Sequence, residues 1–126
     1  MAVILHLIDR TTWESVRGHR EHAPASLAIE GFVHCTDDLD TLLVVANSFY
    51  RDAGDLLALE IDEGALTSEV RWEAPAHPDG RPPAAGEPLF PHVYGPLEIA
   101  AVRTVRALLR DDEGGFVGYA APDAAS

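Results

Sequence analysis

A histidine and a tyrosine two positions apart, in a segment bounded by prolines, are the side chains best suited to chemistry in this sequence. His92 and Tyr94 lie within Phe90–Leu97, beside Pro91 and Pro96. Because proline fixes its own φ angle near about −65°, we expect this segment to be a restricted loop. In an extended backbone, side chains two positions apart project to the same side. An imidazole and a phenol held in this way could transfer a proton or orient a ligand.

Two further histidines stand in strand-like surroundings elsewhere in the chain. His34 and Thr36 belong to a run of six residues that begins at Gly31, and His6 lies in an apolar run near the N-terminus. Side chains where strands end often line clefts. We therefore expect His34 and His92 to line one pocket, with His6 near it. His92 and His34 are the candidate catalytic residues, as a general acid/base and a second hydrogen-bond donor.

Other polar and aromatic side chains are candidates for holding a ligand. Trp72 and Glu73 could place an indole platform and a carboxylate at the rim of a pocket, and Tyr94 offers a second stacking surface. The candidate ligand-binding residues are His6, Thr36, Trp72, Glu73 and Tyr94. The spacing of the three motif histidines matches no short metal-binding motif, so we predict no metal site.

Each candidate also has a structural interpretation. His6 has apolar neighbours, which suit a core histidine bonded to a backbone carbonyl. His92 could tie its loop to the sheet, and Trp72 could be a core residue. The Tyr94 hydroxyl could reach a backbone group. His22 lies near arginines at the end of a predicted helix, and we expect it on the surface.

The charge balance and the single cysteine exclude several classes of function. There are 21 acidic and 9 basic residues, all of the latter arginine, for a net charge of −12. Such a chain repels phosphates, so neither nucleic acid nor an anionic membrane is an expected partner. The lack of lysine excludes Schiff-base chemistry. Cys35 cannot form an intramolecular disulfide, and we expect a buried, inert thiol. No signal-length or membrane-spanning apolar run occurs, which predicts a soluble, cytoplasmic protein.

Hydrophobic periodicity predicts an alternation of strands and helices. Strands are expected at Val3–Ile8, Phe32–Cys35, Leu56–Asp62, Val70–Glu73 and Ile99–Leu109, the last with a helix as the competing interpretation. Helices are expected at about Trp13–Arg20, for one turn at Ser26–Glu30, and at Leu39–Arg51, where Thr36 or Asp37 could cap the N-terminus. Ala74–Pro88 is rich in proline, and we expect a mobile surface flap beside the pocket.

This order predicts an α+β domain over residues 1–112, with a few helices packed on a split or mixed sheet. The end of the chain, residues 113–126, should be a weakly structured tail. No glycine-rich turn follows the first strand, so a doubly wound nucleotide-binding fold is not predicted.

The motifs, taken together, resemble a known family. Trp13, Gly-Phe-Val-His-Cys-Thr from Gly31, Arg-Trp-Glu at 71–73 and Phe-Pro-His-Val-Tyr-Gly-Pro-Leu at 90–97 are similar to the small bacterial family called domain of unknown function 952. The resemblance covers about residues 3–110. That family is similar in predicted fold to the ADP-ribosyltransferase superfamily, whose split sheet binds NAD in a central cleft. The resemblance therefore implies an ADP-ribosyltransferase-like fold.

The resemblance also implies roles for individual residues. His6 stands where such transferases hold the cofactor ribose, and Glu73 is the nearest counterpart of the glutamate that activates the acceptor, with Glu98 as a weaker one. The expected function is to bind or process a nucleotide-like small molecule such as NAD. The alternative is a non-catalytic binding or accessory protein whose motif histidines are structural. The sequence does not determine the oligomeric state.

Overall fold

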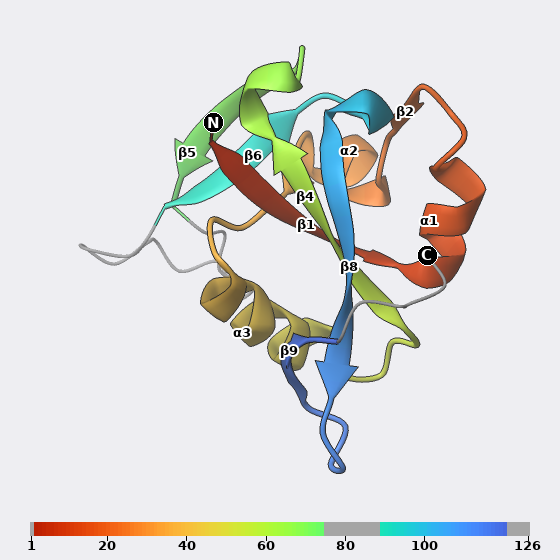
Figure 1. Cartoon of the computed structure of the whole chain (residues 1–126). Coiled ribbons are helices and arrows are strands. Elements are labelled where there is room, and N and C mark those ends of the chain that lie inside the picture. The colour runs from red at the N-terminus through yellow and green to blue at the C-terminus, as the bar shows by residue number, and fades with distance from the viewer. Residues whose placement is uncertain (1, 75–88, 121–126) are drawn as a thin grey trace.

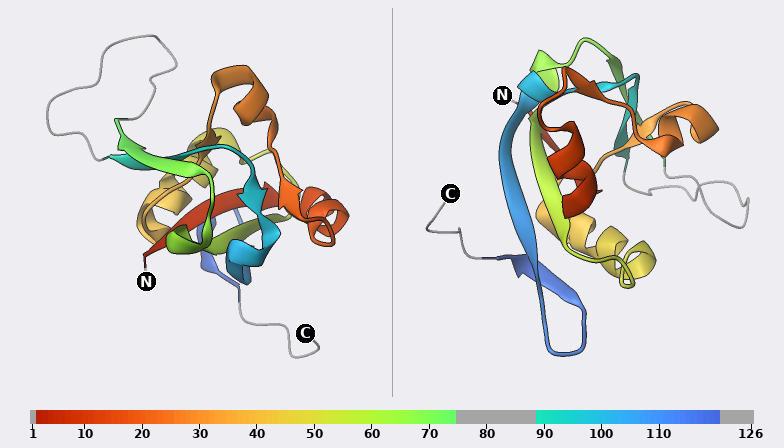
Figure 2. Two further views of the ribbon diagram at one scale, coloured as in Figure 1. Left: turned by 90° about the horizontal axis from the view of Figure 1, so that it is seen from above. Right: turned by 90° about the vertical axis from the view of Figure 1, so that its right-hand side faces the viewer.

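The computed structural model describes residues 2–74 and 89–120, which form an α+β fold with three antiparallel sheets (Figures 1 and 2). The largest sheet has the order β1 (Val3–Asp9), β4 (Leu56–Asp62), β8 (Val102–Arg110) and β9 (Phe116–Tyr119). The second has the order β3 (Val33–His34), β6 (Phe90–Tyr94) and β5 (Glu69–Glu73), and a small third sheet pairs β2 (Glu21–His22) with β7 (Leu97–Glu98). The helices are α1 (Arg10–Val16), α2 (Ala25–Glu30), α3 (Leu39–Phe49) and the 3-10 turns η1 (Glu63–Ala65) and η2 (Ile99–Ala101).

The main core joins the largest sheet to the second sheet. Leu59 and Ile61 of β4 pack there with Val93 of β6. On the other face of β4, Ala58 packs with Leu42 of α3. Because both faces of β4 are covered, its first residues are apolar without alternation.

α3 is held by an N-terminal cap and an apolar stripe. The Asp38 carboxylate accepts a hydrogen bond of 2.8 Å from the Thr41 N–H, so the cap is Asp38 rather than the predicted Thr36 or Asp37. Leu42 is buried against the sheet. A carboxylate at this position satisfies an amide that has no partner within the helix.

The predicted loop at Phe90–Leu97 is mostly a strand. β6 lies between β3 and β5, and its His92 stands opposite His34 on one side and Arg71 on the other. The turn that follows needs Gly95, because a Cβ atom there would clash with the side chain of Ser68.

The predicted tail is also partly a strand. Phe116–Tyr119 forms β9 against β8, and Phe116 is buried with Leu56 of β4. The Asn47 side chain of α3 bonds both the Phe116 N–H and its carbonyl, at 2.7 and 2.9 Å. The predicted flap lies outside the described residues except for Ala74. Among the helices described, none is long and apolar enough to cross a membrane.

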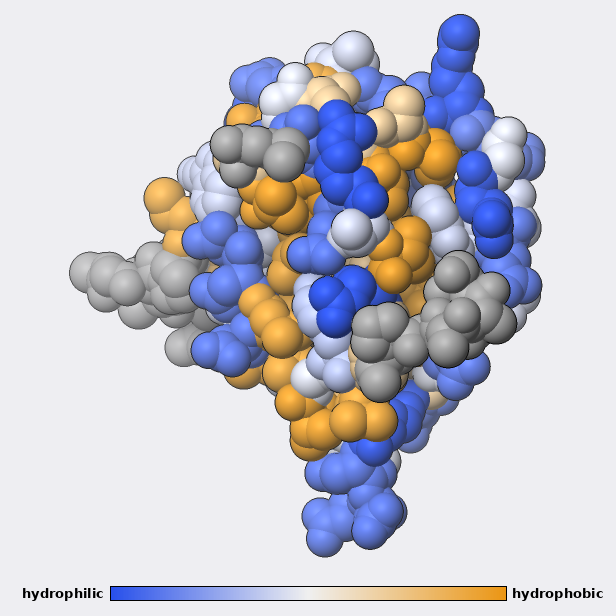
Figure 3. Space-filling view, viewed as in Figure 1, coloured by the Kyte–Doolittle hydropathy of each residue, from blue (hydrophilic) through white to orange (hydrophobic). Residues whose placement is uncertain are grey.

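The surface carries scattered apolar side chains. Large hydrophobic residues remain exposed on β8 and β9, among them Val105, Leu109 and Val117. Figure 3 shows hydrophobic and hydrophilic residues interspersed over the face that β8 crosses. Scattered residues of this kind are ordinary on a folded surface.

The largest sheet and the second sheet touch at one edge of β1 and then separate. Leu5 and Thr36 exchange two backbone hydrogen bonds of 2.8 Å, which form an isolated bridge. An antiparallel ladder would continue with Leu7 and His34. Instead, the His34 carbonyl accepts a hydrogen bond of 2.8 Å from Nδ1 of His6. His6 therefore takes over the bond that would extend the ladder, and the two strands diverge.

Cys35 is buried in the main core, as predicted. Burial also raises the pKa of its thiol, and the thiolate is the reactive form. We expect Ellman's reagent to label Cys35 on the order of a thousandfold more slowly in the folded protein than in urea, because labelling requires unfolding. The absorbance of the released thiolate measures both rates. Equal rates would show that the thiol is accessible.

Candidate functional site

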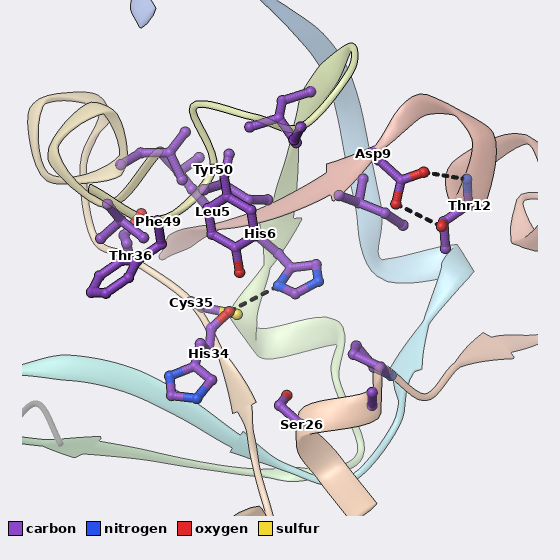
Figure 4. Close-up of a pocket in the computed structure, with 18 of the residues that line it drawn as sticks. Leu5, His6, Asp9, Thr12, Ser26, His34, Cys35, Thr36, Phe49 and Tyr50 are labelled. Carbon is purple, nitrogen blue, oxygen red and sulfur yellow. Dashed lines mark hydrogen bonds between the residues drawn. The ribbon is translucent and has the colours of Figure 1, made fainter. Parts of the chain in front are cut away.

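A cleft of about 1300 Å³ surrounds the free edge of β1 (Figure 4). Its walls come from β1, from the segments around α2 and β3, and from the C-terminal half of α3. Four histidines of the described residues line it: His6, His22, His34 and His92. The structure thus brings His34 and His92 together with their ring centroids 5.6 Å apart. His22 lies in the cleft and not on the open surface, because it pairs with Leu97 in a short sheet.

His6 is a neutral histidine with a fixed tautomer. It is buried, and its ring donates from Nδ1 to the His34 carbonyl. Burial lowers the pKa of His6 to about 4, although the bond to the His34 carbonyl acts in the opposite direction. At neutral pH, Nδ1 therefore carries the proton and Nε2 keeps a lone pair. The partner is a backbone carbonyl, which favours the structural interpretation of His6.

His34 lies at the mouth of the cleft. Gly31 ends α2 with a φ of 91°, a left-handed conformation that glycine adopts without strain, and the chain turns there into β3. The His34 side chain is half-exposed, and its Nε2 lies 2.7 Å from Oε2 of Glu30. Glu30 also lines the cleft. His34 can therefore exchange this partner for a ligand without losing contact with water.

His92 is buried, although it lies on the face of the second sheet that points away from the core. Its neighbour Val93 faces the core, so alternation along β6 directs His92 to the opposite face. The Phe32 ring covers it, stacked at 4.2 Å between ring centroids. Only 4% of His92 is exposed.

Glu73 orients His92 and Tyr94 through one oxygen. Oε1 of Glu73 accepts a hydrogen bond of 3.0 Å from Nδ1 of His92 and a second bond from the Tyr94 hydroxyl. The bond from Tyr94, and then that from His92, lowers the pKa of Glu73. The same bond to Glu73 raises the pKa of Tyr94. The guanidinium of Arg71 lies over the Tyr94 ring, at 4.3 Å from its centroid. A carboxylate that accepts from Nδ1 fixes the orientation of the ring and directs Nε2 away from Glu73.

The predicted ligand-binding residues do not all meet at the cleft. His6 and Thr36 line it, whereas Glu73 and Tyr94 reach it only through His92. Trp72 stands opposite Pro91, on the other face of the sheet from His92, and its Nε1 donates to Glu63 at 3.0 Å. The expected stacking role of Trp72 at the pocket is therefore not supported. Alternation along β5 puts Trp72 and Glu73 on opposite faces of the sheet, although both were expected at one rim of the pocket.

Several residues that line the cleft are not among the site residues predicted from the sequence. Phe49 and Tyr50, at the end of α3, and Ser26 of α2 all line the cleft. Phe49 follows the buried residue Leu42 by seven positions, so helical periodicity places it on the apolar, sheet-facing stripe of α3. Nothing in the sequence indicated that the C-terminal end of this stripe lines a cleft instead of packing in the core. Among the described residues, no three His, Cys, Asp or Glu side chains are placed so that they could hold a metal ion together.

The free edge of β1 exposes backbone groups to the cleft. The backbone N–H and carbonyl groups of the even-numbered residues of β1 point to β4. The same pattern continues just beyond the strand, where the Arg10 N–H donates to the Asp55 carbonyl at 2.9 Å. Leu5 points its N–H and carbonyl the other way, to Thr36. By alternation, Leu7 directs its N–H and carbonyl to the same free edge. Neither the N–H nor the carbonyl of Leu7 has a backbone hydrogen-bond partner in residues 2–74 and 89–120.

Solved structures and a family comparison agree with this description. The X-ray structure of protein CC0527 from Caulobacter crescentus has a TM-score of 0.73 at 22% identity, covering 91% of this chain and 93% of that chain. The solution NMR structure of CC0527 has a TM-score of 0.69 at 23% identity, covering 91% of each chain. These likenesses show a shared fold, and the search of curated proteins gave no match. Residues 7–105 match the family described as Protein of unknown function (DUF952), as the sequence motifs predicted, and the chain belongs to that family.

Proposed function

We propose that this protein binds a nucleotide-like small molecule in the cleft around β1, with NAD as the prototype. The observation that carries the proposal is the N–H and carbonyl of Leu7, which point to the cleft and have no backbone partner among the described residues. NAD is chosen because the motifs resemble a family similar to ADP-ribosyltransferases. In this proposal the fold is ADP-ribosyltransferase-like.

The Leu7 edge complements a primary carboxamide. One residue at a strand edge offers a donor and an acceptor side by side. A carboxamide carries the matching acceptor and donor on adjacent atoms. The nicotinamide group can therefore bond to Leu7 as a neighbouring strand would. Leu7 is half-buried, so these bonds would form with little competition from water.

The groups on either side of this edge suit the rest of a nucleotide. Nε2 of His6 is an acceptor for a sugar hydroxyl, and Ser26 lies on the same side of the cleft (Figure 4). The ring of His22 is 6.5 Å from that of His6 between centroids. Arg10 on the rim is a cation for phosphate oxygens, held 3.5 Å from Asp55. In the catalytic form of the proposal, His92 is the general acid/base, Glu73 holds its tautomer, and His34 donates to the ligand.

Amide shifts of the 15N-labelled protein test the proposal with two matched ligands. Nicotinamide should shift the Leu7 N–H and its neighbours. Nicotinic acid has a carboxylate that cannot donate to the Leu7 carbonyl, so it should bind at least about tenfold more weakly, which is about 1.4 kcal/mol. NAD should shift the same amides and add shifts at Ser26 and His22. If neither nicotinamide nor NAD perturbs any residue of the cleft, the proposal is wrong.

The alternative function is a non-catalytic binding or accessory protein with structural histidines. The bond from His6 to the His34 carbonyl favours it. It predicts that no nucleotide shifts the cleft amides and that changing the histidines alters stability alone.

A further inference from the structure

The outer edge of β5 presents backbone groups that have no partner. The Pro91 carbonyl of β6 bonds to the Cys35 N–H on the β3 side, so the even-numbered residues of β6 direct their backbone groups to the odd-numbered residues of β5. By alternation, Val70 and Trp72 point their N–H and carbonyl groups away from β6. Among the described residues, none of these groups has a backbone partner. Figure 1 shows β5 at the margin of the fold.

Two other strand edges are shielded, and that of β5 is not. At the start of β9, the Asn47 side chain bonds both backbone groups of Phe116. The edge of β1 lies within the cleft. On β5, by contrast, the indole of Trp72 is 39% exposed beside the unpaired backbone groups. An open edge with an exposed apolar side chain is a template for pairing with another strand.

The side chains of β5 are complementary to those of a second copy of the same strand. Glu69, Arg71 and Glu73 lie on one face, with Val70 and Trp72 on the other. In an antiparallel pair with Arg71 on the twofold axis, like charges would stand opposite each other. With Trp72 on the axis, Arg71 stands opposite the partner subunit's Glu73, once on each side, and the two exposed indoles meet. An axis at Val70 would also pair Arg71 with an acid, but it would leave Trp72 opposite a serine.

Arg71 keeps a donor for the carboxylate across this pair. Its Nε and Nη2 donate to Glu69 at 2.9 and 3.1 Å, which leaves Nη1 for a second partner. Glu73 is partly exposed, so a cation from another molecule can reach it. The cross-strand pair therefore adds to the bonds within β5 and does not replace them.

We propose that two copies of this chain associate through β5, antiparallel and with the twofold axis at Trp72, so that their second sheets become continuous. The pairing places Arg71 of the partner subunit beside Glu73, the carboxylate that orients His92. A strand edge of this length buries less than the about 1,600 Å² of a standard interface, so we expect a weak dimer with a dissociation constant on the order of 0.1 mM. The inference does not depend on the proposed function, because it involves no ligand.

Sedimentation equilibrium tests the association across concentrations on either side of this value. The ionic strength should be about 0.15 M, where a Debye length of about 8 Å limits the repulsion between copies that each carry a net charge of −12. Arg71→Glu puts acids opposite one another and should weaken the dimer at least about tenfold. Trp72→Lys puts two cations on the axis and should act in the same direction. Arg17→Glu is the control, because it makes the same change of charge at an exposed position on another element and should leave the dimer unchanged.

Disulfide trapping tests the register. Trp72→Cys should give a cross-linked dimer under mild oxidation, because opposite residues have Cα atoms about 5.5 Å apart, within the range of a disulfide. Cys35 is buried and does not compete. Val44→Cys offers an exposed thiol on α3 and measures random collisions. Trp72→Cys should cross-link at least about tenfold faster, because the dimer raises the effective concentration of its thiol.

Each result supports or overturns the inference. A wild-type protein that sediments as a monomer at every concentration would overturn it. So would a dimer that Arg71→Glu and Trp72→Lys leave unchanged, since another surface would then be responsible. If Val70→Cys cross-links faster than Trp72→Cys, the axis is at Val70 and the contact between Arg71 and the partner subunit's Glu73 is wrong. Melting temperatures confirm that each variant is folded.

Discussion

Lowering the pH from 7 to 4 is expected to destabilise the fold by about 3 kcal/mol through His6 alone, because its pKa falls from 6.5 to about 4 on folding. Between these two values the unfolded chain binds a proton at His6 and the folded protein does not. The free energy of unfolding therefore falls by about 1.4 kcal/mol for each pH unit in this window. Below the folded pKa, both states are protonated and the loss levels off.

Two carboxylates also make the stability of the fold depend on pH, at lower pH than His6 does. The pKa values of Asp9 and Glu73 are lowered on folding, by hydrogen bonds from Thr12 and from Tyr94 respectively. Their stabilisation is present above the unfolded pKa and is lost as the pH falls through the folded pKa. His22 also has a lowered pKa, from partial burial, and adds to the His6 window. A variant comparison is therefore needed to isolate His6.

His6→Asn supplies this comparison. The asparagine amide can donate to the His34 carbonyl but does not titrate. At pH 7, urea unfolding should give His6→Asn a stability within about 1 kcal/mol of wild type. At pH 4 the variant should be the more stable protein. His6→Phe lacks the donor and should lose about 1–3 kcal/mol at pH 7, because it leaves the His34 carbonyl unpaired. If His6→Asn and wild type lose stability in parallel between pH 7 and 4, the ring of His6 is not the group responsible.

The α+β class and most elements could be predicted from hydrophobic patterns. The strand predicted at Leu56–Asp62 is confirmed within its bounds, and the long strand predicted at Ile99–Leu109 is found at Val102–Arg110. Both have apolar residues that pack on a core, which is the property that periodicity reports. α1 begins at Arg10, three residues before the predicted start, because Asp9 caps it. Capping depends on one side-chain rotamer and is harder to predict than periodicity.

The strand β6 could not be predicted, because proline usually excludes a central strand. Pro91 directs its carbonyl to the Cys35 N–H at 3.1 Å, just beyond the end of β3. In an antiparallel ladder the missing N–H of Pro91 would point to this same side. The N–H that Pro91 lacks would therefore face a position beyond the end of β3, where the ladder has already stopped. The strand β9 was missed for a related reason: Gly118 within it, and Gly114 and Gly115 just before it, indicate a turn, and only pairing with β8 makes the segment extended.

The site could be predicted in part. The motif histidines His34 and His92 come together because β3 and β6 pair, although only His34 lies in a strand that was predicted. At the point where β1 diverges from β3, the His34 carbonyl is bonded to His6. The apolar neighbours of His6 favoured a bond to a backbone carbonyl, but nothing in the sequence identified His34 as the partner. Nor did any sequence pattern indicate that the C-terminal end of α3 lines the cleft. The roles of these residues in binding remain proposals.

Replacing His92 with phenylalanine is expected to reduce nicotinamide or NAD binding at least about tenfold while costing only about 1 kcal/mol of stability. The new ring can stay stacked on Phe32, which packs on His92 at 4.2 Å between centroids. It loses the bond to Glu73. That carboxylate is 37% exposed and keeps its bond from Tyr94, so it is not left without partners. What disappears is Nε2, the atom that we propose faces the ligand.

His92→Ala would not separate the two interpretations. It removes a buried ring and should cost about 2–4 kcal/mol through the cavity alone, whatever the function of His92. Tyr94→Phe is the matched control, because it removes the other donor to the same Glu73 oxygen from a residue that does not line the cleft. Its stability loss in urea should equal that of His92→Phe within about 0.5 kcal/mol, and its ligand binding should stay at the wild-type level. If His92→Phe binds nicotinamide and NAD as tightly as Tyr94→Phe does, then His92 only ties β6 to β5 through Glu73. A loss confined to His92→Phe would require its imidazole at the ligand.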